Sequence, residues 1–218
     1  VLPDIIHCHN LHRDYFDLEA LTYLSNKIPT IITLHDAWLL SGHCAHSYNC
    51  TRWKSGCKSC PDLTIYPEIV RDSVSYNWNK KANIYSKSRL YVATPCKWLM
   101  EKVESSILNR GVIQKKVIPN GVDLDVFKPL NKIKARKLLD LPLNKKILLF
   151  VAQSVRSNNW KDFKFLKRAL VELASLYIEE EILLVCLGEE GKTERIGKLK
   201  IKFFTICRRF FRSMVLFF

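Results

Sequence analysis

Four cysteines in the segment 42–63 could hold a metal ion. They follow the spacing C-x5-C-x6-C-x2-C at Cys44, Cys50, Cys57 and Cys60. The last pair has the C-x2-C spacing of structural zinc sites, in which thiolates bind the ion in a closed tetrahedron. The first pair is more widely spaced, so free thiols and disulfides stay open as alternatives. In all three interpretations these cysteines are structural rather than catalytic.

Histidines at the ends of two predicted strands form a second group of candidates. All six histidines lie within the first 46 residues. His7 and His9 should point to the same face of one strand, which ends at His9-Asn10, and the next strand ends at His35-Asp36. His35 could contact a phosphate or a sugar hydroxyl or transfer a proton, or it could be structural. Asp36 could orient His35 or cap the segment that follows.

Two further segments are candidates for binding. Arg156 and Lys161 flank Asn158 and Asn159 in a polar loop between a buried strand and a helix. Backbone amides at a helix N-terminus, together with two cations, can bind a phosphate group, although a solvated basic loop is the alternative. In VIPNGVDLDVF, residues 117–127, we expect a strand, then Asn-Gly with positive φ and an Asx-type turn at the aspartates.

Short apolar runs alternate with longer amphipathic segments along the chain, which predicts parallel βαβ units in an α/β fold. The runs lack strict alternation, so we expect strands buried on both faces. Ligands of open parallel sheets bind beyond the carboxyl ends of the strands, where the polar candidates lie. The runs occupy residues 4–10, 30–36, 89–95, 115–121, 145–153 and 181–189, and the helical segments residues 16–27, 78–88, 96–108 and 160–177.

The domain organisation follows from a break in this pattern at a stretch with two prolines. We expect an incomplete N-terminal domain at residues 1–128, a linker at 129–143 and the start of a second domain at 144–191. The tail, residues 192–218, holds eight Lys and Arg against one Glu, a local charge of +7. Plotted as a helix, residues 198–218 are basic and amphipathic, which suits peripheral membrane contact. An unselected tail produced by a premature end is the alternative.

Composition excludes several classes of protein. The chain has 218 residues, 48% of them apolar, and a net charge of +14 that is concentrated in the tail. No nucleic-acid-binding motif accompanies the charge, so we expect no nucleic-acid partner. A transmembrane helix is not expected, because no long uncharged apolar stretch occurs. Eight cysteines are too few for a disulfide scaffold, which favours reduced thiols in the cytoplasm. The chain begins at Val1 and reads as an internal fragment.

Five segments, taken in order, resemble the family-4 (group 1) glycosyltransferases of the two-domain GT-B type, in particular those that build bacterial surface polysaccharides such as colanic acid. They are PDIIHCHN, TIITLHDAWLLSGHCAHSYNCTRWKSGCKSCPDL, ATPCKWL, VIPNGVDLDVFKP and LLFVAQSVRSNNWKDF. The resemblance covers residues 3 to about 190. A zinc-binding interaction module without transfer activity, or a sugar-nucleotide epimerase on the same architecture, are the other readings.

The resemblance implies two Rossmann-like doubly wound domains, both incomplete here, and a retaining transfer from a nucleotide sugar to a glycan or lipid-linked acceptor. His35 and Asp36 match the catalytic strand end, and His9 and Asn10 lie on the acceptor side. Lys161, Arg156, Asn120 and Gly121 match the donor side, where cations stabilise the departing diphosphate without a catalytic metal. The enzyme would work in the cytoplasm, and the tail could bind the inner face of the plasma membrane.

The sequence also departs from the family pattern. The residue after Lys161 is commonly glycine in the family and is Asp162 here. The glycine-rich loop of the first domain and the paired glutamates of the second are absent. We therefore expect this chain to be a truncated member with little or no activity by itself.

Overall fold

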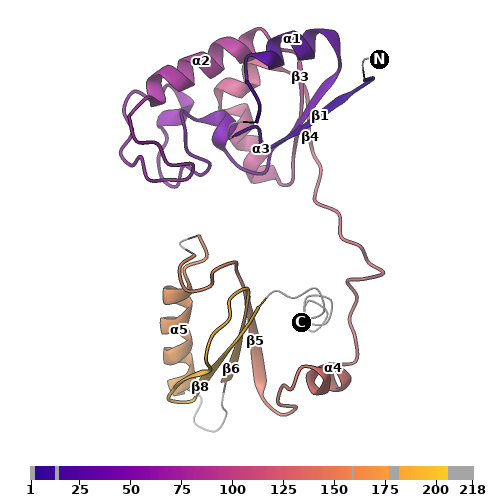
Figure 1. Ribbon diagram of the computed structural model, residues 1–218, viewed down its shortest axis with the longest axis vertical. Helices are drawn as coiled ribbons and strands as arrows, with labels where there is room; N and C mark the ends of the chain where they lie inside the picture. Colours follow the sequence, from indigo (N-terminus) through magenta and orange to yellow (C-terminus); the bar gives the residue numbers. More distant parts are fainter. Residues whose placement is uncertain (1–2, 13–14, 159, 177–181, 206–218) are drawn as a thin grey trace. The chain divides into compact units, whose positions relative to one another are not determined.

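The computed structural model describes residues 3–12, 15–158, 160–176 and 182–205 of the chain. They form two compact units, Val1–Gly121 and Val122–Phe218, and each unit contains its own sheet and its own core (Figure 1). Both sheets have four strands and are predominantly parallel. The predicted α/β class is confirmed, and the sheets are consistent with two Rossmann-like domains.

The first unit is a parallel sheet whose strands follow one another in space as they do in sequence. Its strands are β1 (Ile6–His9), β2 (Thr30–Thr33), β3 (Leu90–Thr94) and β4 (Val112–Val117). The crossovers contain α1 (Ala20–Lys27), α2 (Val74–Ser86) and α3 (Lys97–Glu104). A parallel sheet needs such crossovers, because consecutive strands run in the same direction. The four strands predicted in this half of the chain are all present.

Burial differs between the strands of this sheet. In β2, Thr30 and Ile32 are buried while Ile31 and Thr33 are half-buried, and β4 has no buried residue. In β1, His7 and His9 are exposed, so the prediction of burial on both faces is wrong for β1, β2 and β4. α1 and α2 pack side by side, and the Asn26 side chain of α1 donates a 2.8 Å hydrogen bond to the carbonyl of Lys87, just after α2.

The long segment between β2 and α2 is held on the unit by buried aromatic side chains. Tyr85 is completely buried and its hydroxyl donates to the carbonyl of Leu39 at 2.9 Å. Trp78 donates to the Trp53 carbonyl, and Trp53 donates to the Cys50 carbonyl, both at 2.9 Å. Buried Tyr and Trp need such partners for their polar atoms. The segment contains two short 3-10 helices, η1 (Trp38–Leu40) and η2 (Arg52–Lys54).

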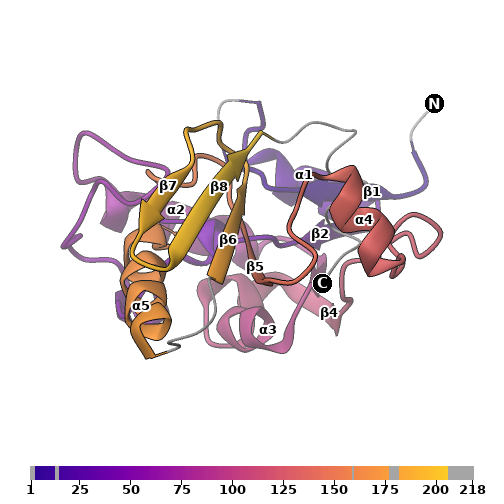
Figure 2. The ribbon, with the colours of Figure 1, turned by 90° about the horizontal axis from the view of Figure 1, so that it is seen from below.

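The second unit is a mixed sheet in the order β5-β6-β8-β7, in which β7 alone is antiparallel (Figure 2). Every residue of β6 is buried, as predicted for a strand covered on both faces, but β5 has no buried residue and contradicts that prediction. α5 crosses between β5 and β6, and its buried Phe163, Leu170 and Ala174 join the core. The elements are α4 (Lys132–Leu138), β5 (Lys146–Val151), α5 (Phe163–Leu176), β6 (Ile182–Leu187), β7 (Glu194–Ile196) and β8 (Leu199–Phe204).

The start of the predicted tail has a different structure from the one expected. Residues 194–196 and 199–204 form β7 and β8, so the amphipathic-helix prediction for 198–218 is wrong over residues 199–204. The rest of the predicted helix, residues 206–218, lies outside the described residues. The boundary between the units falls after Gly121, where the sequence indicated about residue 128. The predicted linker at 129–143 contains α4.

A close backbone approach at Gly111 gives a test of how the first unit packs. Gly111 ends the 3-10 helix η3 (Ile107–Gly111), and a Cβ placed there would lie 2.4 Å from the carbonyl oxygen of Tyr85. We expect Gly111→Ala to destabilise the protein by about 1–3 kcal/mol, because either η3 or the end of α2 must move. Urea unfolding measures this. Gly121→Ala, where the added Cβ meets nothing within 4 Å, is the control and should be close to neutral.

Candidate functional site

The strand-end histidines meet at the carboxyl edge of the first sheet. The Nδ1 of His9 and the Nε2 of His35 lie 2.9 Å apart, so one ring donates a hydrogen bond and the other accepts it. His7 pairs with the hydroxyl of Thr33 at 2.8 Å, and its ring lies 4.3 Å from that of His9. All three imidazoles are exposed. The prediction that His7 and His9 share a face is confirmed.

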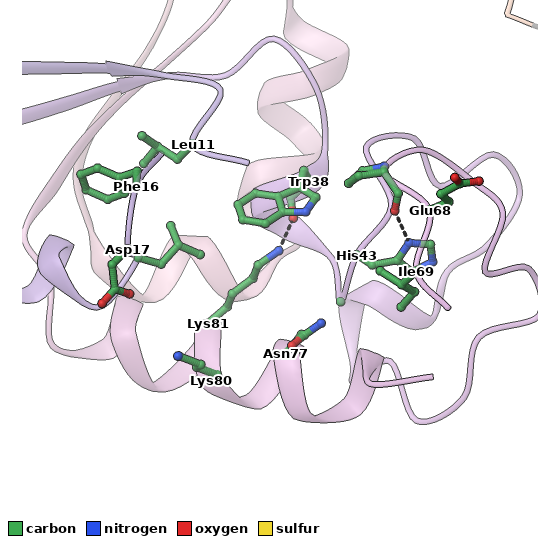
Figure 3. Close-up of a pocket in the computed structure, with 13 residues that line it drawn as sticks. Leu11, Phe16, Asp17, Trp38, His43, Glu68, Ile69, Asn77, Lys80 and Lys81 are labelled. Atoms are coloured by element: carbon green, nitrogen blue, oxygen red, sulfur yellow. Dashed lines mark hydrogen bonds between the residues drawn. The ribbon is translucent and has the colours of Figure 1, made fainter. Parts of the chain in front are cut away.

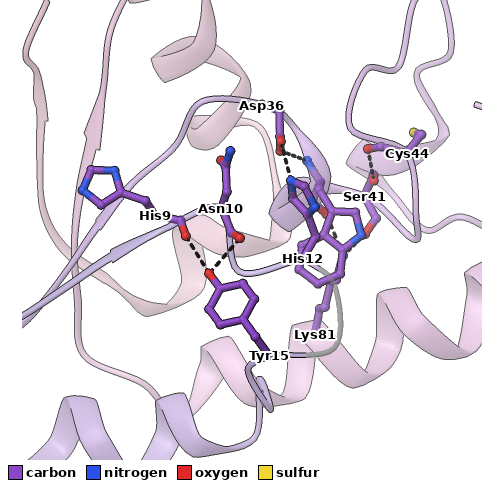
Figure 4. A network of polar contacts seen from close by, with 9 residues as sticks. His9, Asn10, His12, Tyr15, Asp36, Ser41, Cys44 and Lys81 are labelled. Atoms are coloured by element: carbon purple, nitrogen blue, oxygen red, sulfur yellow. Dashed lines mark hydrogen bonds and ion pairs between the residues drawn. The ribbon is translucent and has the colours of Figure 1, made fainter. Parts of the chain in front are cut away.

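Asp36 does not pair with His35 in the structure. Its Oδ2 forms a 3.0 Å ion pair with the Nε2 of His12, and its Oδ1 accepts the Trp38 N–H at 2.9 Å (Figure 4). Of the two roles considered for Asp36, capping of the following segment is the one observed. The capped segment is η1, which begins at Trp38. The Nδ1 of His12 is buried and has no hydrogen-bond partner among the described residues.

Tyr15 closes the turn after β1. Its hydroxyl lies 2.8 Å from the carbonyl oxygen of His9 and 2.9 Å from that of Asn10 (Figure 4). Asn10 has a φ of 43°, in the left-handed region that asparagine tolerates better than most residues. The turn therefore fixes the backbone at the two residues that were predicted to line the acceptor side, and leaves both side chains exposed.

Lys81 is a buried amine beneath this edge. From α2 its Nζ donates to the carbonyls of Trp38 at 2.6 Å and Ser41 at 2.9 Å, and it lies 3.6 Å from the centre of the Trp38 ring. Burial lowers the pKa of Lys81 to about 7, because the charged form loses its hydration. Ser41 in turn donates to the Cys44 carbonyl at 2.7 Å. The network thus joins the strand end to the cysteine segment.

The edge is chemically suited to an oxygen-rich ligand. An imidazole can donate a hydrogen bond through one ring nitrogen and accept one through the other. In the bond between His9 and His35, each ring uses only one of its two nitrogens. Hydroxyls and phosphate oxygens are matching partners. Asp36 reaches this edge only through the backbone of its neighbour His35, since its carboxylate is bound to His12 and Trp38. The geometry leaves His35 exposed at the edge, whereas the Asp36 carboxylate is bound to His12 and to the backbone of Trp38.

In the second unit, Arg156 is bound to two carboxylates. Its backbone N–H and guanidinium both bond Glu189, at 2.8 and 2.5 Å, and its other terminal nitrogen lies 3.2 Å from Glu194. The guanidinium also lies 3.8 Å from the centre of the Phe203 ring. These bonds lower the pKa of Glu189. A phosphate at this position would have to compete with two carboxylates for the same cation.

Lys161 lies in the turn that leads into α5. Asn158 accepts the backbone N–H groups of Trp160 and Lys161, both at 3.1 Å, and the Lys161 side chain is exposed. Asp162 has a φ of 42° and its carboxylate accepts the N–H of Phe165 at 3.0 Å. A helix N-terminus favours negative charge, and here Asp162 supplies it. The anion site predicted from sequence is therefore partly occupied by the chain's own carboxylate.

The Asn-Gly turn lies at the end of the first unit. Asn120 and Gly121 are exposed, and neither has the positive φ that was predicted. The Asx-type turn is present, since the Asp123 carboxylate accepts the N–H groups of Asp125 and Val126 at 3.0 and 3.2 Å. Assignment of Asn120 and Gly121 to donor binding stays a prediction.

The four cysteines of the predicted metal site line one small cavity of about 20 Å³, together with His43. His43 is buried, its Nδ1 lies 3.1 Å from the Pro67 carbonyl, and its Nε2 lies 3.2 Å from the Cys60 sulfur. Burial raises the pKa values of Cys44, Cys57 and Cys60. All seven cysteines within the described ranges are free thiols.

A metal-binding arrangement is not present as the side chains stand. Among the described residues, no group of three or more His, Cys, Asp or Glu side chains is placed to hold a metal ion. The prediction of a closed tetrahedral site is thus unsupported by the side-chain positions, although the gathering of the four cysteines around one cavity is observed.

Three residues of this region were missed in the sequence. His12, Tyr15 and Lys81 form its polar contacts, yet none follows a predicted strand. Lys81 lies in a helical segment where a lysine normally faces solvent, and His12 lies in the crossover to α1. Only the fold brings His12 and Lys81 to their partners, which are 24 and 43 residues away in the sequence, whereas Tyr15 bonds residues five and six positions before it.

Comparison with known proteins finds similarity to a protein whose name states a function. The chain is 27% identical over 134 residues to a protein from Escherichia coli (strain K12) named as a colanic acid biosynthesis glycosyl transferase, WcaC. The match covers 56% of this chain and 32% of the relative, so the chain spans about a third of that protein. No protein-family model matches the chain. Within the described ranges, no helix has the length and apolar character needed to cross a membrane.

The depressed pKa of Lys81 predicts a pH-dependent contribution to stability. Between pH 7 and about 10 the unfolded chain keeps a proton on Lys81 that the folded chain has lost, so stability should rise with pH. Relative to Lys81→Met, the protein should gain on the order of 1 kcal/mol per pH unit in this range. Urea unfolding of both at several pH values measures the difference.

Lys80→Met is the matched control. Lys80 is only half-buried and pairs with Glu19 at 2.8 Å, which raises its pKa. Its effect on stability should therefore be independent of pH from 7 to 9. Parallel pH profiles for Lys81→Met and the unmodified protein would contradict the assignment of a neutral, buried Lys81.

Proposed function

We propose that the chain is part of a family-4 glycosyltransferase of the GT-B type, which transfers a sugar from a nucleotide-sugar donor to a hydroxyl of a glycan or lipid-linked acceptor, with retention of configuration, in polysaccharide biosynthesis. The observation that carries the proposal is the similarity to a named polysaccharide glycosyl transferase. The two parallel-dominated α/β units are compatible with it. The reaction would take place in the cytoplasm. Membrane contact, predicted for residues 198–218, stays a prediction only for the residues after β8, because Leu199, Ile201 and Phe203 are buried in that strand.

The first unit supplies the acceptor side in this proposal. His35 would contact the reacting sugar, and His9 and Asn10 would bind hydroxyls at the same edge. Their exposure and the hydrogen bond between His9 and His35 support these roles. Asp36 would act through the backbone, because its carboxylate holds His12 and the start of η1.

The second unit supplies the donor side. Negative charge develops on the departing nucleoside diphosphate, and fixed cations and backbone N–H groups stabilise it. Lys161 is the better placed of the two predicted cations, since its side chain is exposed while Arg156 is bound to Glu189 and Glu194. Arg156 would instead keep its loop in place, because its backbone N–H is bonded to Glu189 just after β6.

Donor binding can be measured without turnover, which suits a chain that spans only part of its relative. We expect the protein to bind UDP, GDP or ADP in a calorimetric titration and Lys161→Ala to weaken that binding by about tenfold, the effect of one charge-assisted contact. Lys164→Ala removes the same charge from an exposed position in α5 and should leave binding unchanged. Binding of no nucleoside diphosphate, or equal affinity in all three proteins, would contradict the donor-side assignment.

A second proposal concerns the cysteine segment, where we infer that Cys44, Cys50, Cys57 and Cys60 bind one structural zinc ion. The supporting observation is that all four line a cavity of about 20 Å³, room for a single small atom. The present thiol positions do not form a metal site, so binding requires the side chains to turn inward. Each cysteine has one side-chain torsion, which makes this a local change.

Metal analysis of the purified protein tests the zinc proposal. We expect about one equivalent of zinc and its loss in Cys57→Ser, because a structural site needs its full ligand set. Cys96→Ser, an exposed cysteine outside the segment, is the control and should keep the metal. A folded protein with less than half an equivalent would reject zinc, and thiol titration would then separate free thiols from disulfides.

A further inference from the structure

A cavity of about 560 Å³ lies in the first unit between the β1–α1 crossover, the cysteine segment and α2. This volume is within the range of small-molecule sites. Its lining combines apolar groups with polar ones. Phe16 and Leu11 lie on one side, and Glu68, Ile69 and His43 lie on the other, with Lys81 between them (Figure 3).

The wall of the cavity is fixed by a buried polar side chain. Lys81 is 3% exposed, and its amine fixes the backbone through the carbonyls of Trp38 and Ser41. The same amine lies 3.6 Å from the centre of the Trp38 ring, so it also packs against the indole that lines the cavity. Gly42 lies directly after Ser41 in the chain, where a Cβ would come within 2.6 Å of the Val74 carbonyl oxygen. The cavity is therefore formed before any ligand binds.

The charges of the lining argue against an anionic ligand. Lys80 is paired with Glu19 at 2.8 Å, and Lys81 is committed to two carbonyls. Two carboxylates, Asp17 and Glu68, stand exposed at the rim. An anion entering here would meet like charge and no uncommitted ammonium group of the lining.

The same lining argues against a purely apolar ligand, which would desolvate both carboxylates and the Asn77 amide without giving them hydrogen bonds. A pyranose ring satisfies both demands, because its hydroxyls donate to carboxylates and its C–H faces pack on Phe16 and Trp38. We propose that this cavity binds a neutral sugar ring, and, resting on the function proposed above, that the ring is a residue of the acceptor glycan.

The cavity is connected to the strand end through Trp38 and Asp36. Trp38 lines the cavity, and its backbone N–H donates to Asp36 at 2.9 Å. Asp36 is the immediate neighbour of His35. A sugar held against Trp38 would therefore contact a residue whose backbone is bonded to Asp36, next to the proposed catalytic His35. This makes the cavity a positioning site for the acceptor rather than a second reaction centre.

Ligand-observed NMR with the full chain tests the proposal, using the methyl α-pyranosides of glucose, galactose and mannose as probes. At least one should bind with a dissociation constant in the millimolar range. Asp17→Asn and Glu68→Gln should each weaken it by about tenfold, the value of one hydrogen bond to a charged acceptor. Glu101→Gln, an exposed carboxylate on α3, is the matched control and should change nothing.

Acetate and cyclohexanol serve as the anionic and apolar competitors, and neither should displace the pyranoside. Failure of all three pyranosides to bind, displacement by either competitor, or equal binding by the rim variants and Glu101→Gln would overturn the proposal. Unchanged urea midpoints show that a variant has not simply unfolded. Pyranoside binding without nucleoside diphosphate binding would contradict the transferase assignment alone, whereas the reverse result would contradict the sugar cavity alone.

Discussion

The amine of Lys81 is the contact on which the first unit's functional side depends. It bonds two carbonyls of the segment that follows β2, and so ties Trp38 and Ser41 to α2. Burial favours its neutral form, whose two N–H groups match the two carbonyls. A hydrophobic side chain of similar length would remove this donor from both carbonyls, and the Trp38 carbonyl would keep only the 3.3 Å bond from the Ser41 N–H. Burying a lysine costs free energy, but its two hydrogen bonds fix the course of a loop that has little regular structure.

Parallel pairing is the second constraint. β1 and β2 are in register with His9 opposite Thr33, so the residues just beyond Thr33 must pass beside the end of β1. This is why His35 reaches the ring of His9 although 26 residues separate them. Polar residues that follow buried strands can be assigned to one edge from the sequence alone, since strands of a parallel sheet end together.

Elements with a clear apolar pattern were predictable from the sequence. The six predicted strands and α5 were found because their apolar runs are long and bounded by polar groups. The helix predicted across β8 was an avoidable error, since Leu199, Ile201 and Phe203 alternate with lysines and are the buried positions. The pairing of Asp36 with His12 could not be read, because it depends on how a crossover folds over a distant strand end.

Asp162 shows how a departure from a family pattern can be accommodated. Its φ of 42° is in the region where glycine has no steric penalty, which gives a physical reason for the glycine that the resemblance leads one to expect there. Aspartate adopts this conformation at moderate cost and gains a hydrogen bond from Phe165 at the start of α5. Its negative charge then lies beside Lys161. A diphosphate at this helix end would therefore depend on the exposed lysine more strongly than one bound at a glycine turn, where no carboxylate competes.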